Sequence, residues 1–91
     1  MYIILCRTDN RAWLEGHYFE NEEDAINEAK YQAKLFSIDN KIELNIQPTY
    51  LIYPNGKGGM IKEINGYMII DKNNCLLFDA VVHSVEKWQV K

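Results

Sequence analysis

The spacing of apolar positions divides the first half of the chain into two strands and a helix. Residues 2–8 form an apolar run rich in β-branched and aromatic side chains, which is typical of a buried strand. Turn-forming residues follow at 9–11, and residues 12–19 are expected to return as the second strand of a hairpin, with Gly16 at a bulge. After residue 20 the period of the pattern changes to that of a helix.

The segment from about residue 22 to residue 36 has the pattern of an amphipathic helix. Asn21 is expected to cap its first turn, and three acidic residues follow at 22–24, where the helix dipole favours negative charge. Small residues in the apolar stripe allow the helix to lie close to a sheet. The stripe consists of Ala25, Ile26, Ala29, Ala33 and Phe36.

The segment from residue 41 to residue 71 predicts strands joined by turns. Apolar and polar residues alternate over 41–47, and Pro48 is expected to interrupt this strand because proline has no backbone N–H group to donate. A short segment at 50–53 resumes the extended pattern. The pair Asn65-Gly66 is expected to form a tight type I′ turn between strands at 60–64 and 67–71.

The last twenty residues allow two interpretations. A turn at 72–74 precedes an apolar strand at 75–78. We expect a further strand from about Val82 to Val90, since valines are frequent there and Trp88 and Val90 are spaced by two. The alternative is a helical tail whose apolar stripe would include Val81, Val85 and Trp88.

Together these elements predict an α+β fold in a single domain over residues 1–91. The expected sheet is mostly antiparallel, has five to seven strands and carries one helix (about 22–36) on one face. Strands such as 67–70 and 75–78 have apolar residues in both alternation classes. One helix covers one face only, and we therefore expect a homodimer that covers the other.

Charge and hydropathy narrow the class of protein. The net charge is −3, and residues 12–29 contain six acidic residues and no lysine or arginine, which argues against a nucleic-acid-binding protein. No apolar run approaches the roughly 18 residues of a membrane span. The apolar start has neither a basic n-region nor a small-residue cleavage site, so we expect a cytoplasmic protein that does not associate with membranes.

The cysteines and histidines give no motif for metal binding or catalysis. Cys6 and Cys75 both lie in apolar runs and are expected to be buried free thiols. No two of these residues and the histidines, His17 and His83, are spaced like a local pair of metal ligands. A Cys/His nucleophile would require an exposed, electropositive thiolate. We therefore expect no metal, no cofactor and no catalytic residue, with a small enzyme using His17 or His83 as the third hypothesis.

Two surface segments are candidate binding sites. One is the glycine-rich loop of Asn55, Gly56, Lys57, Gly58 and Gly59. It lacks the Ser/Thr and the following helix of a phosphate-binding P-loop, so a mobile surface hairpin is the simpler interpretation. The other is the acidic face of Glu20, Glu22, Glu23 and Asp24. These acids could bind a basic partner or form a metal or acid/base site, although stabilisation of the start of the helix is the simpler explanation.

The main hypothesis is a small non-enzymatic protein–protein interaction module. The abundance of Ile, Asn and Lys is typical of an AT-rich genome, where small domains without motifs are often phage-borne or mobile-element accessory proteins. Such a protein would bind and modulate a larger host protein. The alternative hypothesis is a small-ligand or nucleotide-binding protein that uses the loop at residues 55–59.

Overall fold

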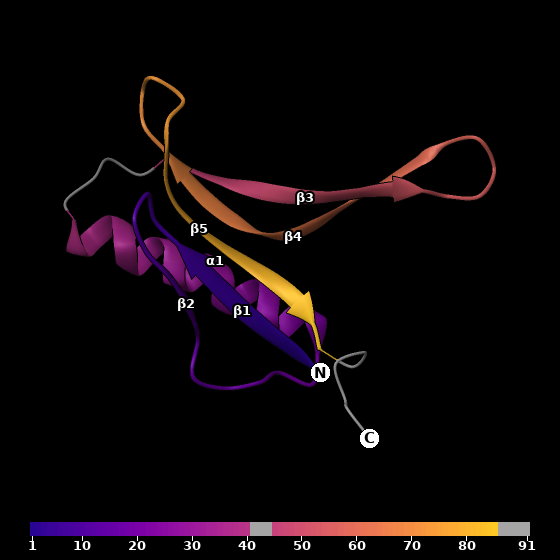
Figure 1. Cartoon of the computed structure of the whole chain (residues 1–91), viewed down its shortest axis with the longest axis horizontal. Helices are drawn as coiled ribbons and strands as arrows, with labels where there is room; N and C mark the ends of the chain where they lie inside the picture. Colours follow the sequence, from indigo (N-terminus) through magenta and orange to yellow (C-terminus); the bar gives the residue numbers. More distant parts are fainter. Residues whose placement is uncertain (41–44, 86–91) are drawn as a thin grey trace.

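A computed structural model describes residues 1–40 and 45–85 of the chain. In these residues five strands form one antiparallel sheet, with a single helix packed against it (Figure 1). The strand order in the sheet is β2-β1-β5-β4-β3. The α+β fold predicted from the sequence is therefore confirmed. The elements are β1 (Tyr2–Arg7), β2 (Ala12–Leu14), α1 (Glu22–Asp39), β3 (Ile46–Pro54), β4 (Met60–Ile70) and β5 (Leu76–Ser84).

Helix α1 begins where the sequence predicts. The Asn21 side chain accepts hydrogen bonds from the backbone N–H groups of Glu23, at 2.8 Å, and Asp24, at 3.4 Å. The helix continues to Asp39, three residues beyond the predicted end, and Asn40 closes it with two hydrogen bonds to the carbonyl oxygen of Phe36. Its buried positions include Ala25, Ala29 and Ala33, while Ile26 and Phe36 are half-buried.

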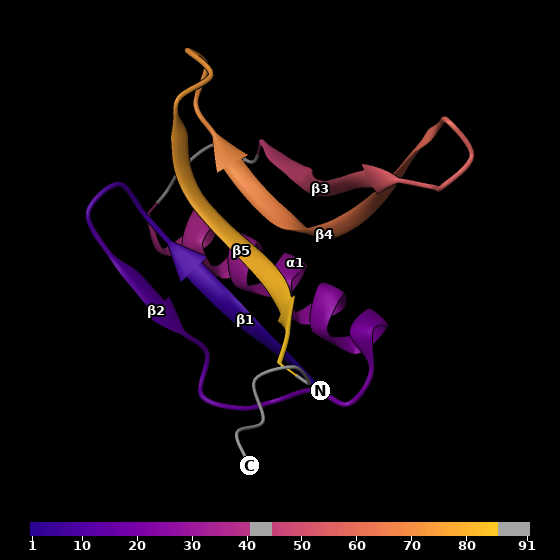
Figure 2. The same ribbon diagram turned by 45° about the vertical axis from the view of Figure 1, so that its right-hand side comes forward.

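The core lies between α1 and the face of the sheet against which the helix is seen to lie in both ribbon views (Figures 1 and 2). The three buried alanines let the helix axis approach the central strands closely. Phe36 of the helix stacks on Phe78 of β5, with their ring centroids 4.7 Å apart. The sheet side of the core is formed by buried residues of the central strands β1, β4 and β5, namely Ile4, Cys6, Ile69, Phe78, Ala80 and Val82.

The predicted turn at Asn65-Gly66 is wrong, because β4 runs through both residues without a break. Gly66 pairs with Thr49 while Ile64 pairs with Tyr50, so Asn65 is an extra residue and forms a bulge. The Asn65 side chain accepts a 2.6 Å hydrogen bond from the hydroxyl of Thr49. The hairpin turn between β3 and β4 is instead the glycine-rich loop at residues 55–59.

Other predicted boundaries also shift. Pro48 does not interrupt β3, because β3 is an edge strand and a missing donor on its outer side breaks no pairing. Strand β2 is only three residues long, so Gly16 lies outside it and forms no bulge in it. Residues 81–84 are in β5 and not in a helix. The predictions for residues 41–44 and 86–91, Trp88 included, lie outside the described residues.

Within the described residues, no helix is both long enough and apolar enough to span a membrane.

Candidate functional site

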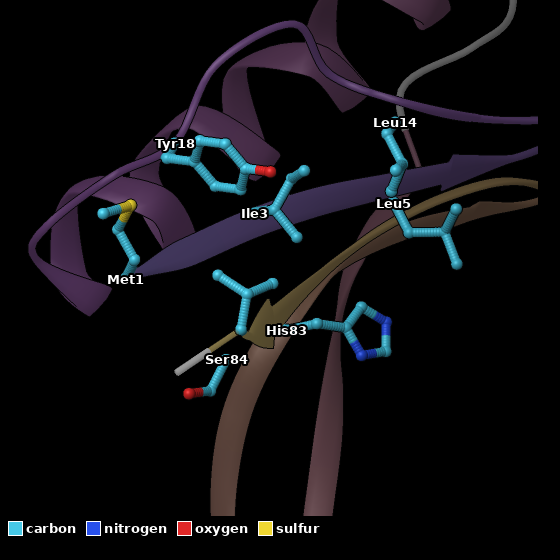
Figure 3. A pocket seen from close by; sticks show the side chains of 8 residues that line it. Met1, Ile3, Leu5, Leu14, Tyr18, His83 and Ser84 are labelled. Carbon is cyan, nitrogen blue, oxygen red and sulfur yellow. The ribbon is translucent and has the colours of Figure 1, made fainter. Parts of the chain in front are cut away.

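The main candidate site is an apolar hollow of about 660 Å³ on the sheet face opposite α1 (Figure 3). Alternation along β1 produces it. Ile4 and Cys6 point toward the helix, so Ile3 and Leu5 lie on the other face, where no helix covers them in the described chain. The hollow lies beside the edge formed by β1 and β2 and extends to the end of β5. It is lined by Met1, Ile3, Leu5, Leu14, Tyr18, His83, Ser84 and Val85.

The lining of the hollow combines apolar side chains, of which Ile3 is buried and Leu14 and Tyr18 are exposed, with a few polar groups. Leu14 and Tyr18 are each 58% exposed, although both are large side chains that proteins normally bury in part. Leu14 pairs directly with Leu5 across β2 and β1. The polar groups come from His83 and Ser84 at the end of β5, and from the hydroxyl of Tyr18. This lining is suited to receiving an apolar side chain from another molecule.

An ion pair lies on the same sheet face. Arg7 and Asp79 are direct cross-strand neighbours, and the guanidinium donates Nε to Oδ1 at 3.0 Å and Nη2 to Oδ2 at 2.6 Å. The hydrogen bonds and charge of Asp79 raise the pKa of Arg7 above its ordinary value. Asp79 is buried, so this two-point contact compensates its charge. The ion pair therefore links neighbouring positions of β1 and β5.

The structure does not assemble a catalytic pair from the cysteines and histidines. Burial, with smaller contributions from nearby carboxylates, raises the pKa of the Cys6 thiol to about 12, which opposes formation of a nucleophilic thiolate. Cys6 faces the helix, whereas His83 lies on the opposite face of the sheet. The His17 ring packs against Phe19, with centroids 4.6 Å apart.

Cys75 is exposed, so the prediction that both cysteines are buried is wrong for this residue. The apolar run that contains it begins one residue later as strand β5. Cys75 closes the preceding turn, where its backbone N–H donates to the Asp71 carboxylate at 2.9 Å. Both thiols are free, as predicted.

We expect the native protein to react with one equivalent of a maleimide and not with two. Cys75 is exposed and should be labelled rapidly, whereas Cys6 is buried and resists ionisation. Mass spectrometry of the labelled protein measures this directly, and Cys75→Ser should abolish the rapid reaction. Rapid double labelling of the native protein would contradict the buried position of Cys6.

The glycine-rich loop is held by one of its own side chains. The Asn55 side-chain oxygen accepts hydrogen bonds from the backbone N–H groups of Lys57, at 2.7 Å, and Gly59, at 3.1 Å. The Asn55 N–H also donates to the carbonyl oxygen of Gly59 at 3.0 Å. Gly56 and Gly58 have φ angles of 80° and 82°, which glycine adopts without strain. Several N–H groups that could bind a phosphate are therefore already used.

The acidic residues Glu20, Glu22, Glu23 and Asp24 are all exposed around the start of α1. The cap formed by Asn21 and the helix dipole explain their presence at this position. Among the described residues, no three His, Cys, Asp or Glu side chains gather closely enough to hold a metal ion. The four acidic side chains are therefore solvated and occupy positions that favour the start of the helix.

The hollow was not among the sites predicted from the sequence. The sequence does contain an indication of the hollow, because apolar residues occur at both odd and even positions of the first strand and so point to both faces of the sheet. That pattern predicts an apolar second face but does not identify the loop residue Tyr18 or the end of β5 as its neighbours. Comparison of the chain with protein families, with curated proteins and with solved structures gives no match.

Proposed function

We propose that this protein is a non-enzymatic interaction module that binds a larger protein through the apolar hollow. The observation that carries the proposal is the hollow of about 660 Å³ on the uncovered sheet face. Contiguous exposed apolar surface is characteristic of interaction sites in soluble proteins. We expect the partner to present an apolar side chain that projects from its surface. This side chain would insert between Leu14 and Tyr18.

The composition of the hollow supports a protein partner. Aromatic side chains with one polar end, such as Tyr18, are enriched at the points that contribute most to protein binding. His83 and Ser84 belong to the lining and can supply hydrogen bonds beside its apolar side chains. Fixed hydrogen bonds within the loop at residues 55–59 make a nucleotide site there the weaker hypothesis.

The proposal is tested by affinity capture from the native host with three forms of the tagged protein. We expect the wild type to capture a specific partner and Leu14→Glu to bind it at least about tenfold more weakly, since a tenfold change corresponds to ~1.4 kcal/mol. The introduced carboxylate would have to be desolvated inside the hollow. Binding to the purified partner is then measured by calorimetry.

The matched control is Ile38→Glu, which places the same charge on helix α1. Ile38 is 67% exposed and does not line the hollow, so its replacement should leave both folding and partner binding unchanged. Equal capture by the Leu14→Glu variant and the wild type would refute the hollow as the binding site. Loss of capture in both variants would point to a different surface.

A further inference from the structure

The two Asn-Gly pairs of the chain have opposite environments in the structure. Among the asparagines of the sequence, only Asn55 and Asn65 are followed by glycine. Asn55-Gly56 begins the loop at the tip of the β3–β4 hairpin (Figure 1). Asn65-Gly66 lies inside β4, which runs between β3 and β5 in the sheet. A reaction of Asn-Gly pairs that depends on the freedom of the backbone should therefore distinguish the two positions.

Asparagine is a chemically labile residue, because its side-chain amide can be lost. The backbone nitrogen of the next residue gives up its proton and attacks Cγ of the side chain, so a new N–Cγ bond closes a cyclic imide. The Cγ–Nδ2 bond breaks, and Nδ2 leaves as ammonia. Water then opens the imide to aspartate, or to isoaspartate, in which the chain continues through Cγ. Glycine favours ring closure because it has no Cβ atom to shield its nitrogen.

The loop leaves the attacking nitrogen of Gly56 accessible. Asn55 and Gly56 are both exposed, so water reaches them. Within the described residues, no acceptor bonds the N–H of Gly56, and a Cβ atom built on this glycine would meet no atom within 4 Å. The peptide group between the two residues can therefore turn toward the side chain without displacing another part of the chain.

The hydrogen bonds to the Asn55 side chain act on its oxygen. The backbone N–H groups of Lys57 and Gly59 donate to Oδ1 at 2.7 Å and 3.1 Å. Attack at Cγ moves negative charge onto this oxygen, and donors that already point at it stabilise that charge, as in an oxyanion hole. The loop therefore activates the carbonyl group that the nitrogen of Gly56 attacks.

Asn65-Gly66 has none of this freedom. Gly66 is buried and pairs with Thr49 of β3 on one side and with Val81 of β5 on the other. A Cβ atom built on it would overlap the carbonyl oxygen of Ala80, so β5 leaves its backbone no room to turn. Ring closure at Asn65 would require the central strands of the sheet to separate.

We propose that Asn55 is a deamidation site of the native protein and that Asn65 is protected by the sheet. Aspartate at position 55 keeps an oxygen that accepts the N–H groups of Lys57 and Gly59. Isoaspartate lengthens the backbone by one carbon and moves the carboxylate, so these two bonds are lost and the loop is released. No residue of 55–59 lines the hollow, so this proposal does not depend on the proposed function.

Peptide mapping by mass spectrometry tests the site on the purified full chain during incubation at neutral pH. Trypsin cleavage after Lys57 and Lys62 places the two asparagines on different peptides. We expect Asn55 to deamidate at least about tenfold faster than Asn65, which corresponds to ~1.4 kcal/mol in the barrier. Incubation in urea is the matched control. Unfolding gives both pairs the same freedom, so their rates should become similar, chiefly because Asn65 becomes faster.

Brief digestion of the native protein tests the effect on the loop, after ion exchange has separated the deamidated forms. The isoaspartate form should be cleaved after Lys57 severalfold faster than the unmodified chain, whereas Asn55→Asp should be cleaved at about the unmodified rate. Three results would each overturn the proposal: equal rates at Asn55 and Asn65 in the native protein, deamidation of Asn55 only after unfolding, or equal cleavage of the isoaspartate form and the unmodified chain.

Discussion

Replacing Gly66 with alanine should lower the melting temperature by roughly 12–24 °C, which corresponds to a loss of about 3 kcal/mol in the free energy of unfolding. A Cβ atom at this position would lie 2.1 Å from the carbonyl oxygen of Ala80 and 2.8 Å from the Cα of Val81. Both atoms belong to the backbone of β5, a central strand. Relief of the overlap would require β4 and β5 to separate, which would disturb the pairing between them.

The matched control for this prediction is Gly16→Ala. A Cβ added at Gly16 meets no atom within 4 Å, so the same chemical change should alter the melting temperature little. Thermal unfolding followed by circular dichroism compares the two variants. If Gly66→Ala melted within about 3 °C of the wild type, the close approach of β4 to β5 would be incorrect.

The same glycine explains why a turn was wrongly predicted at Asn65-Gly66. Asn-Gly between two apolar runs is a strong local signal for a hairpin, because glycine readily adopts positive φ angles. Here Gly66 is needed for a different reason, the absence of a Cβ atom next to β5, and Asn65 forms a bulge bonded to Thr49. Both requirements arise from contacts with other strands. A local motif cannot distinguish a turn glycine from one that permits close packing.

The helix, in contrast, could be predicted because its determinants are local. The cap at Asn21, the acidic first turn and the apolar spacing all lie within one segment, and the structure confirms each of them. The ends of the strands were harder to predict, because they depend on which other strands lie beside them in the sheet. Pro48 reads as a strand break unless β3 is known to be an edge strand, and that depends on the order of all five strands.

The candidate site was less predictable than the fold, for a related reason. The hollow brings together the N-terminal segment, with β1, β2 and the loop that contains Tyr18, and the end of β5, which lies far from that segment in the sequence. Each contributes ordinary apolar residues without a recognisable motif. The exposed position of Cys75 was also missed, because one residue separates the end of a turn from the start of a strand.

Replacing Ala29 with aspartate should destabilise the fold by about 3–5 kcal/mol, the range observed when a charge is left buried without a partner. Ala29 is fully buried at the centre of the helix–sheet interface, where its small side chain allows close contact. Burial disfavours the charged carboxylate, so the pKa of the introduced carboxyl should be higher in the folded than in the unfolded protein. The folded state then binds the proton more tightly, and the destabilisation should be larger at about pH 7 than at about pH 5.

Urea unfolding of Ala29→Asp at the two pH values measures both effects, with Asn27→Asp as the control. Asn27 is an exposed residue of the same helix, so the control introduces the same acid without burying it and corrects for the pH response of the rest of the protein. We expect a near-native midpoint for Asn27→Asp at both pH values. A near-native midpoint for Ala29→Asp at neutral pH would mean that this helix face does not pack on the sheet. A large loss that did not depend on pH would instead indicate a steric cause, because the side chain of aspartate is larger than that of alanine.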